Sequence, residues 1–273
     1  MANTTNTQAV VVGIDGSRAA MEAAVWAIDE AIDRDVPLRL VHATGIPRQS
    51  PGPAGALAPE IEYGETSLRA ASSLVEGAGK AVKVEAEILW GSVEDALIAE
   101  SMSASMVCVG SVGIGWVAQR VLGSTAVAVA RKANCPVVVI RYPSEVGPGR
   151  SSAWIVVGID ERPENEEVVT RALAEARLRH APVLAVGTWH SELGALSYDS
   201  LESRVAMWQE RNPDLHIRAV STGGSLPEFL VGYPNDVALA VVSGKDADQL
   251  PLIIGPHERP LLPHAECSVM VVH

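Results

Sequence analysis

The sequence is poor in aromatic residues and in positive charge. Aromatic residues make up 4% of the 273 residues, with a single phenylalanine, so a surface that stacks nucleobases is not expected. Lysine and arginine total 21 against 33 aspartates and glutamates, which gives a formal net charge of -12. Because an acidic chain repels phosphate backbones and anionic lipids, we expect neither a nucleic acid nor a membrane as a partner.

Cysteines are few, and targeting signals are missing. Cys108, Cys135 and Cys267 lie far apart in apolar runs, without CxxC spacing, which predicts buried free thiols in a reducing compartment and no disulfide or zinc site. The first residues show no basic region followed by an apolar stretch, so no signal peptide is expected. No apolar run approaches the ~18 residues of a membrane span. We therefore expect a cytoplasmic protein.

Signatures of catalysis are missing too. The sequence contains no GK[ST] phosphate loop and no GxSxG, and no Ser/His/Asp or Cys/His pair falls on matching loops. The segment Gly113–Ala118 fits GxGxxA, but it follows the fourth predicted strand, and a ribose-binding acidic residue about 20 positions further on is missing. One cluster of acidic and histidine residues is formed by His257, Glu258, His264 and Glu266. Because its spacing fits no metal-ligand motif, we expect a solvated loop there and no metal site.

What the sequence does contain is an internal repeat. AVVVGID in the first half returns as WIVVGID in the second, 145 residues later. Three pairs of segments recur in the same order, namely residues 9–15 and 154–160, residues 91–97 and 224–230, and residues 133–139 and 265–271. The repeat predicts a tandem duplication, with one domain at residues 1–145 and a shorter one at residues 146–273, joined by a turn-rich linker at residues 143–151.

Strand and helix patterns alternate within the first copy. Short apolar runs predict five strands, at residues 10–14, 38–42, 82–89, 105–109 and 136–141. Between them the pattern predicts helices that start after Ser17, near residues 61–76, after the capping-box serine Ser92 and near residues 117–132. The first helix has apolar positions at helical spacing, which are Met21, Ala24, Val25, Ile28 and Ile32. Alternation of this kind indicates an α/β fold with a parallel, doubly wound sheet in each copy.

Ligands of such sheets bind beyond the carboxyl ends of the strands. The loop after the first strand holds Gly13 and Asp15, and the loop after the fourth strand is the glycine-rich segment 110–115. Gly123-Ser124-Thr125 follows, with two hydroxyls beside a glycine. A glycine-rich turn before a helix lets backbone N–H groups approach an anion, so these loops predict a phosphate site.

The whole layout resembles the universal stress protein family, and in particular its tandem-domain members. The resemblance rests on VGID in the first strand, on the spacing Gly110-x2-Gly113-x9-Gly123-Ser124, and on the ending NCPVVVI at residues 134–140. That spacing is the pattern of the ATP-binding branch. The resemblance implies two flavodoxin-like sandwiches, each with a five-stranded parallel sheet, and ATP with Mg²⁺ across the carboxyl edge of the first.

The resemblance also assigns roles to individual residues. Asp15 and Val41 would contact adenine and ribose, Val41 through its backbone, and Gly13 belongs to the same loop. The phosphates would be held by Gly110, Ser111, Gly113, Gly123, Ser124 and Thr125. Each role has a structural alternative: Asp15 as a cap or turn residue, the glycines as plain turn residues, and His42, which ends the second strand, as a hydrogen-bonded histidine or as a pocket residue.

The second copy departs from the pattern. With Gly244 taken as the partner of Gly110, Ala247 stands where the second glycine is required, and Pro256 stands opposite Ser124. Glu161 follows the repeated aspartate, and its charge would oppose a nucleotide. Prolines crowd the stretch where the first copy has its fourth helix, at Pro251, Pro256, Pro260 and Pro263. We expect the second site to be degenerate.

The glycine-rich loops and the resemblance together predict an ATP-binding protein. The resemblance alone implies that it is a nucleotide-dependent regulator of stress response or growth arrest, with a protein partner that the sequence does not identify. Mutual pairing of the last strands, at residues 136–141 and 268–273, would join the domains with pseudo-two-fold symmetry. The resemblance implies the same pairing and, in addition, a homodimer of two chains. One alternative is a slow ATPase or self-phosphorylating enzyme, although no base for water is visible. Another is an interaction protein with no bound nucleotide.

Overall fold

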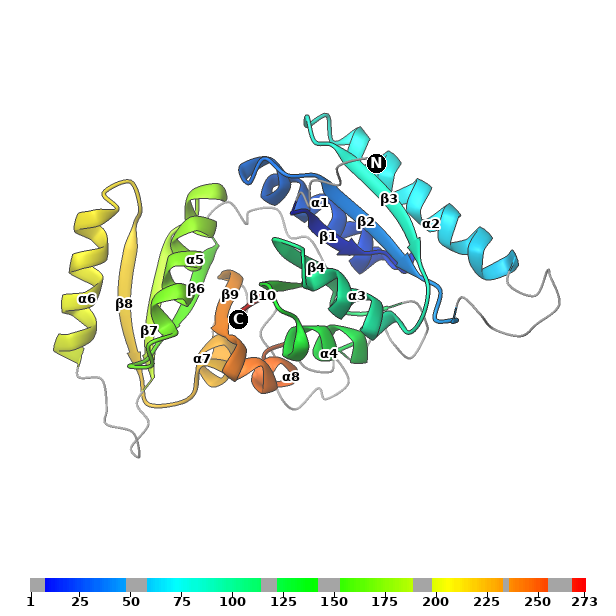
Figure 1. Ribbon diagram of the computed structural model, residues 1–273. Helices are drawn as coiled ribbons and strands as arrows, with labels where there is room; N and C mark the ends of the chain where they lie inside the picture. The colour runs from blue at the N-terminus through cyan, green and yellow to red at the C-terminus, as the bar shows by residue number, and fades with distance from the viewer. Residues whose placement is uncertain are drawn as a thin grey trace. The chain divides into compact units, whose positions relative to one another are not determined.

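The structure is a computed structural model that describes residues 8–47, 58–113, 122–141, 153–188, 198–232, 236–254 and 267–273. The chain divides into two compact units, unit 1 within residues 1–142 and unit 2 within residues 143–272 (Figure 1). The linker predicted at residues 143–151 lies outside the described residues. None of the described helices is long and apolar enough to span a membrane.

Unit 1 is built around a parallel sheet with the strand order β3-β2-β1-β4-β5. Its strands are β1 (Val10–Gly13), β2 (Leu38–Ala43), β3 (Val84–Leu89), β4 (Met106–Gly110) and β5 (Val137–Ile140). Its helices are α1 (Arg18–Asp33), α2 (Ala58–Gly77), α3 (Val93–Ser101) and α4 (Ser124–Lys132). Helices α1 and α2 pack together against one part of the sheet, and α3 packs with α4 (Figure 1). The strand order reverses between β1 and β4, which is where such folds bind ligands.

Unit 2 repeats this arrangement with the order β8-β7-β6-β9-β10. Its strands are β6 (Trp154–Ile159), β7 (Val183–Thr188), β8 (Ile217–Thr222), β9 (Val237–Ser243) and β10 (Ser268–Val272). Its helices are α5 (Asn165–Leu178), α6 (Tyr198–Arg211), α7 (Leu226–Gly232), the 3-10 helix η2 (Gly244–Gln249) and α8 (Leu250–Ile254). The predicted α/β fold with a five-stranded parallel sheet in each copy is confirmed. Pairing between the two sheets stays a prediction.

Element ends follow the sequence prediction closely, except before α4. Each predicted strand of unit 1 is present, with ends shifted by no more than two residues. The helix predicted near residues 117–132 begins at Ser124, because Gly123 has the extended backbone of an N-cap. Residues 117–121 lie outside the described residues. In unit 2, Pro251 falls in the first turn of α8, where a missing N–H costs nothing, and the other three prolines of the crowded stretch lie outside the described residues.

Serine caps begin two of the helices as predicted. Ser92 accepts the N–H of Asp95 at 3.1 Å, and the Asp95 carboxylate bonds the serine hydroxyl, so only half of the capping box forms. The repeat completes it in unit 2, where Ser225 and Glu228 each accept the other's N–H, at 3.4 and 2.7 Å. Ser17 likewise accepts the N–H of Ala20 at the start of α1.

The buried face of α1 differs from the prediction. Ala24 and Ile28 are buried, but Met21 and Val25 are only half-buried, and Ile32 is 43% exposed. The face is instead lined by small side chains, which are Ala19, Ala20, Ala23, Ala27 and Ala31. A prediction of the buried face from large apolar residues misses a face of this kind, because alanine contributes little to the hydrophobic periodicity of a helix.

Gly110 explains why this face consists of small residues. A Cβ atom at Gly110 would lie 2.7 Å from the carbonyl carbon of Ala19 and 2.8 Å from the nitrogen of Ala20. Helix α1 therefore lies directly against the end of β4. Gly110 has a packing role in the fold, whatever it contributes to a ligand.

Each unit also holds a buried ion pair at the same place in the repeat. Glu30 is fully buried and pairs with Arg34, the C-cap of α1. Glu175, which is 2% exposed, pairs with Arg179, the C-cap of α5, at 3.0 Å. Both are i,i+4 pairs, and both members recur at the 145-residue offset of the repeat. The duplication thus preserved a buried charge that composition alone does not reveal.

Substituting Gly110 with alanine tests the close approach of α1 to β4. Gly110→Ala should destabilise the protein by about 1–3 kcal/mol, because backbone must move to admit the Cβ. Urea unfolding measures the change. The matched control is Gly77→Ala at the end of α2, where nothing lies within 4 Å of an added Cβ. The control should leave stability unchanged or slightly raised, and equal effects of the two substitutions would contradict the packing role.

Candidate functional site

Unit 1 carries a cavity at the carboxyl ends of β1, β2 and β4, with a volume of about 330 Å³. This volume lies at the lower end of the range of small-molecule sites. Eight of the nine residues predicted to hold a nucleotide line it, and these are Gly13, Asp15, Val41, Gly110, Gly113, Gly123, Ser124 and Thr125. The loop after the first strand, the loop after the fourth and the start of α4 therefore meet at one cavity.

Ser111, the ninth predicted residue, is buried and is not among the lining residues. Its N–H donates to the carbonyl of Ile140 at 2.8 Å, and its carbonyl accepts the N–H of Gly123 at 2.9 Å. Ser111 thus connects the loop after β4 to the residue that precedes α4. The N–H groups of Ser111 and Gly123 are both engaged within the protein.

Asp15 shapes a turn and also faces the cavity. Its Oδ1 accepts the N–H of Ser17 at 2.9 Å, which is the turn role left open by the sequence. Its Oδ2 points toward Gly113, since a Cβ atom there would lie 2.9 Å from this oxygen. A side chain at Gly113 would therefore crowd the carboxylate.

Strand β2 and helix α2 hold the loop that carries Asp15. The Nδ1–H of His42 donates to the carbonyl of Ile14 at 2.7 Å, and the Tyr63 hydroxyl donates to the carbonyl of Asp15 at 2.9 Å. The carbonyl of Val41 accepts the N–H of Ile14 at 2.8 Å, so the sheet already uses it once. Both readings of His42 hold, because it is hydrogen-bonded and also lines the cavity.

Gly16 supports the loop that carries Asp15, a role that the sequence prediction did not include. Its φ is +83°, a conformation that favours glycine, and a Cβ atom would lie 2.3 Å from the hydroxyl oxygen of Tyr63. The glycine thus lets α2 close over the loop. Tyr63 gives no signal in the sequence, because it lies 48 residues from Asp15 in an ordinary helical pattern.

The start of α4 presents backbone donors to the cavity. Its N-cap Gly123 makes no side-chain cap hydrogen bond. Among the described residues, nothing accepts a hydrogen bond from the N–H groups of Ser124, Thr125 or Ala126, all of which line the cavity. Such donors and the positive end of the helix dipole favour an anion. Gly115 and the rest of residues 114–121 lie outside the described residues.

The remaining wall of the cavity is apolar. It is formed mainly by aliphatic side chains, which are Ile14, Val41, Ala43, Val93, Leu97 and Val109. The site therefore joins an apolar surface to a set of anion-binding donors, an arrangement that suits a flat apolar group linked to an anionic one.

The sheet register of unit 2 corrects one sequence alignment. In unit 1, Val12 of β1 pairs with Cys108 of β4, and in unit 2 the repeated Val157 pairs with Val241. Ser243 therefore takes the place of Gly110 and Asp246 that of Gly113, so the alignment of Gly244 with Gly110, and of Ala247 with Gly113, was wrong by one position. Aligning glycine with glycine shifted the register, and the second glycine is replaced by a carboxylate.

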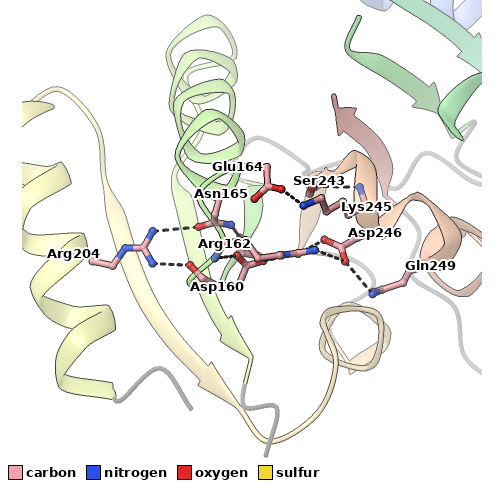
Figure 2. Close-up of polar contacts among 10 residues, drawn as sticks. Asp160, Arg162, Glu164, Asn165, Arg204, Ser243, Lys245, Asp246 and Gln249 are labelled. Atoms are coloured by element: carbon pink, nitrogen blue, oxygen red, sulfur yellow. Dashed lines mark hydrogen bonds and ion pairs between the residues drawn. The ribbon is translucent and has the colours of Figure 1, made fainter. Parts of the chain in front are cut away.

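An ion-pair cluster occupies the carboxyl edge of unit 2 (Figure 2). The Arg162 guanidinium donates to Oδ2 of Asp160 at 2.8 and 2.5 Å and to Oδ2 of Asp246 at 2.5 Å. The two carboxylates raise the pKa of Arg162, and the Asp160 bond is the larger cause. Lys245 pairs with Glu164 across the same two loops. This edge of unit 2 is thus tied together by side chains of opposite charge.

Helix α6 holds the aspartate loop of unit 2 as α2 does in unit 1. Arg204 donates to the carbonyl of Asp160 at 2.9 Å and to Oδ1 of Asn165 at 3.2 Å (Figure 2). Burial lowers the pKa of Arg204, against the attraction of nearby carboxylates. The same carbonyl in unit 1, that of Asp15, accepts from Tyr63, so the two units hold one backbone position with different side chains.

Comparisons with known proteins agree with this geometry. The sequence profile described as the universal stress protein family matches residues 6–141. Universal stress protein Rv2624c of Mycobacterium tuberculosis is 44% identical over 263 residues, which cover 96% of this chain and 95% of that protein. The chain belongs to the universal stress protein family.

Solved structures show the same fold. A universal stress protein from Archaeoglobus fulgidus superimposes with a TM-score of 0.72 at 14% identity, over 97% of this chain and 95% of that chain. Another universal stress protein, solved in complex with cAMP, is 28% identical and covers 50% of this chain and 98% of its own, with a TM-score of 0.41. The first match extends the universal stress protein fold to nearly the whole chain.

The three cysteines of this universal stress protein are buried and form no disulfide, as predicted. Burial raises the pKa of the Cys135 thiol to about 11. Among the described residues, no group of three His, Cys, Asp or Glu side chains is placed to hold a metal ion. The cluster at His257, Glu258, His264 and Glu266 lies outside the described residues.

The raised pKa predicts that Cys135 is unreactive in the native protein. At pH 8 about 0.1% of a thiol with this pKa is thiolate, which is the reactive form. Ellman's reagent should therefore label Cys135 only slowly at pH 8, and faster as the pH rises toward 11. In urea all three cysteines should react at once. Labelled peptides identified by mass spectrometry report each site, and rapid native labelling of Cys135 would contradict its burial.

Proposed function

We propose that unit 1 binds an adenine nucleotide, namely ATP with Mg²⁺, and that the protein is a nucleotide-dependent regulator in stress response or growth arrest. The observation that carries the proposal is the cavity of unit 1, where an apolar wall faces the backbone donors at the start of α4. Family membership supports it, since the glycine spacing of the chain is the one associated with ATP-binding members.

The lining residues divide naturally between the parts of a nucleotide. The base would lie against the aliphatic wall formed by residues such as Val41 and Leu97. The phosphates would lie near Gly113 and accept hydrogen bonds from the N–H and hydroxyl groups of Ser124 and Thr125. The carboxylate of Asp15 and the two hydroxyls are oxygen ligands of the type that Mg²⁺ prefers, so the residues present suit the ion.

Unit 2 would not bind a nucleotide under this proposal. Its counterpart of Gly113 is Asp246, which brings a negative charge to the position where phosphates would lie. Arg162, a cation at this edge, is engaged by Asp246 and Asp160. We therefore expect one nucleotide per chain.

A first experiment asks whether the protein contains or takes up a nucleotide. Freshly purified protein is denatured, and the supernatant is analysed for adenine nucleotides by mass spectrometry. Nucleotide-free protein is then heated with Mg-ATP. At a concentration of 100 times Kd, ligand stabilises by about 2.7 kcal/mol, which should raise Tm by roughly 5–10 °C. Finding neither a released nucleotide nor a shift in Tm would overturn the proposal in favour of an interaction protein without a nucleotide.

A second experiment tests the phosphate end of the site with Gly123→Asp. The position has φ of -61°, and the nearest atom to an added Cβ is 3.8 Å away, so a side chain fits. Aspartate caps a helix at least as well as glycine, so Tm should not fall. Its charge should weaken ATP binding by about tenfold or more, through repulsion of phosphate, without changing the affinity for adenosine. Calorimetry measures both ligands.

The matched control is Gly123→Asn, which supplies a cap of the same shape without the charge. We expect it to weaken ATP binding less than the aspartate does. Equal ATP affinities of the wild-type protein and Gly123→Asp would place the phosphates elsewhere and contradict the assignment. A loss of adenosine binding in both variants would mean that position 123 contacts the nucleoside.

A further inference from the structure

The two units keep an aspartate at the same place and change what surrounds it. Asp15 follows β1 and Asp160 follows β6, at the 145-residue offset of the repeat. Each accepts the N–H of the residue two positions later, at 2.9 and 2.8 Å. That later residue is Ser17 in unit 1 and Arg162 in unit 2. One turn therefore carries a small hydroxyl in one unit and a long cation in the other.

The loop after the fourth strand of each unit also differs between the two units. Gly113 of unit 1 is replaced by Asp246 in unit 2, according to the sheet register. In unit 1 a side chain at this position would collide with the aspartate carboxylate, since a Cβ would lie 2.9 Å from Oδ2 of Asp15. In unit 2 the added carboxylate lies beside Asp160 because Arg162 stands between them (Figure 2).

The links between these two loops also differ. In unit 1 the Ser17 hydroxyl donates to the carbonyl of Val112 at 3.2 Å, and both residues line the cavity. In unit 2 the Arg162 guanidinium spans the same gap, and Gln249 donates to Asp246 from the end of η2 at 3.4 Å. The side chains of Arg162, Asp160 and Asp246 are 37%, 27% and 24% exposed, so the cluster lies at the surface edge and is not part of the core.

We infer that Arg162 and Asp246 form an internal ion-pair plug at the ligand edge of unit 2, and that Ser17 and Gly113 keep the matching edge of unit 1 open. These two positions of the repeat determine which unit accepts a nucleotide. The part of the inference that concerns a ligand rests on the proposed function, whereas the plug itself does not.

The charges explain why Arg162 closes this edge and does not attract a phosphate. Asp160 and Asp246 together neutralise the guanidinium and exceed it by one negative charge, so an entering anion would meet repulsion from both carboxylates. The raised pKa of Arg162, caused first by Asp160 and then by Asp246, agrees with this tight engagement. Removing the cation alone would leave two carboxylates face to face, which is unfavourable.

The plug also changes how the following helix begins. Helix α1 starts at Arg18, directly after its serine cap, whereas α5 starts at Asn165 and the side chain of its N-cap residue, Glu164, makes no capping hydrogen bond. By the offset of the repeat, α5 begins two residues later than α1. Unit 2 has thus lost a cap at the position where it has gained the plug cation.

Transplanting the plug into unit 1 of the full chain tests the inference. Ser17→Arg alone should lower Tm through the lost cap, and Gly113→Asp alone should lower Tm because it faces Asp15. The double variant should recover much of the loss, so that its Tm lies clearly above the value expected if the two shifts were added. Its affinity for adenosine, measured by calorimetry, should fall by about tenfold or more, because the guanidinium fills the edge.

The matched control replaces the carboxylate by an amide of the same shape, in the pair Ser17→Arg and Gly113→Asn. It should show no comparable recovery of Tm. The reverse cycle in unit 2, with Arg162→Ser and Asp246→Gly, provides the same coupling if the transplanted chain fails to fold, and there the double variant should be less destabilised than the sum of the single ones.

Each outcome decides the inference. Strictly additive Tm shifts in both cycles would overturn the plug, and so would wild-type adenosine affinity in a folded double variant. If the wild-type protein itself binds neither adenosine nor ATP, the proposed function is wrong. The assignment of unit 1 as the nucleotide-binding unit is then wrong as well. The Tm coupling would still confirm or refute the ion-pair plug as a structural feature.

Discussion

The close approach of α1 to the end of β4 is the contact on which the rest of unit 1 depends. It requires a helix face of alanines and a strand that ends in Gly110, where an added Cβ would meet the helix backbone. This contact brings the loop after β1 beside the loop after β4, so that Asp15 lies next to Gly113 across nearly 100 residues of sequence. A ligand edge at the strand-order reversal follows from this packing, before any ligand is considered.

The two units show that the backbone framework has changed less than the side chains that support it. The carbonyl of the loop aspartate accepts a hydrogen bond from the helix after the second strand in both units, from Tyr63 in one and from Arg204 in the other. An unpaired carbonyl at this turn would cost free energy, and either donor removes the cost. Divergence was therefore free to change the chemistry of the edge, from hydroxyl and glycine to guanidinium and carboxylate, while the turn kept its shape.

Much of this structure could be predicted from local sequence signals, whereas the contacts between residues distant in the sequence could not. Apolar runs marked the strands of unit 1, and Ser92 marked a helix start, because these features depend on neighbours within a few residues. The contact of Gly16 with Tyr63 and the pairing of Arg162 with Asp246 join residues 47 or more positions apart, so no local pattern contains them. The glycine match at Gly244 misled the alignment by one residue, since strand register is set by hydrogen bonds and not by residue type.

An edge closed by its own ion pairs and an edge that holds a cavity respond differently to a ligand. Under the proposed function, a nucleotide stabilises unit 1 by mass action, because it binds the folded state and not the unfolded chain. Unit 2 gains nothing from the nucleotide, since Arg162 already supplies the cation and Asp246 the anion at the matching place. A chain with one ligand-dependent half and one ligand-independent half can report nucleotide level through the stability of a single unit. That asymmetry, which arises from two positions of the repeat, is the physical basis on which a tandem regulator of this kind would operate.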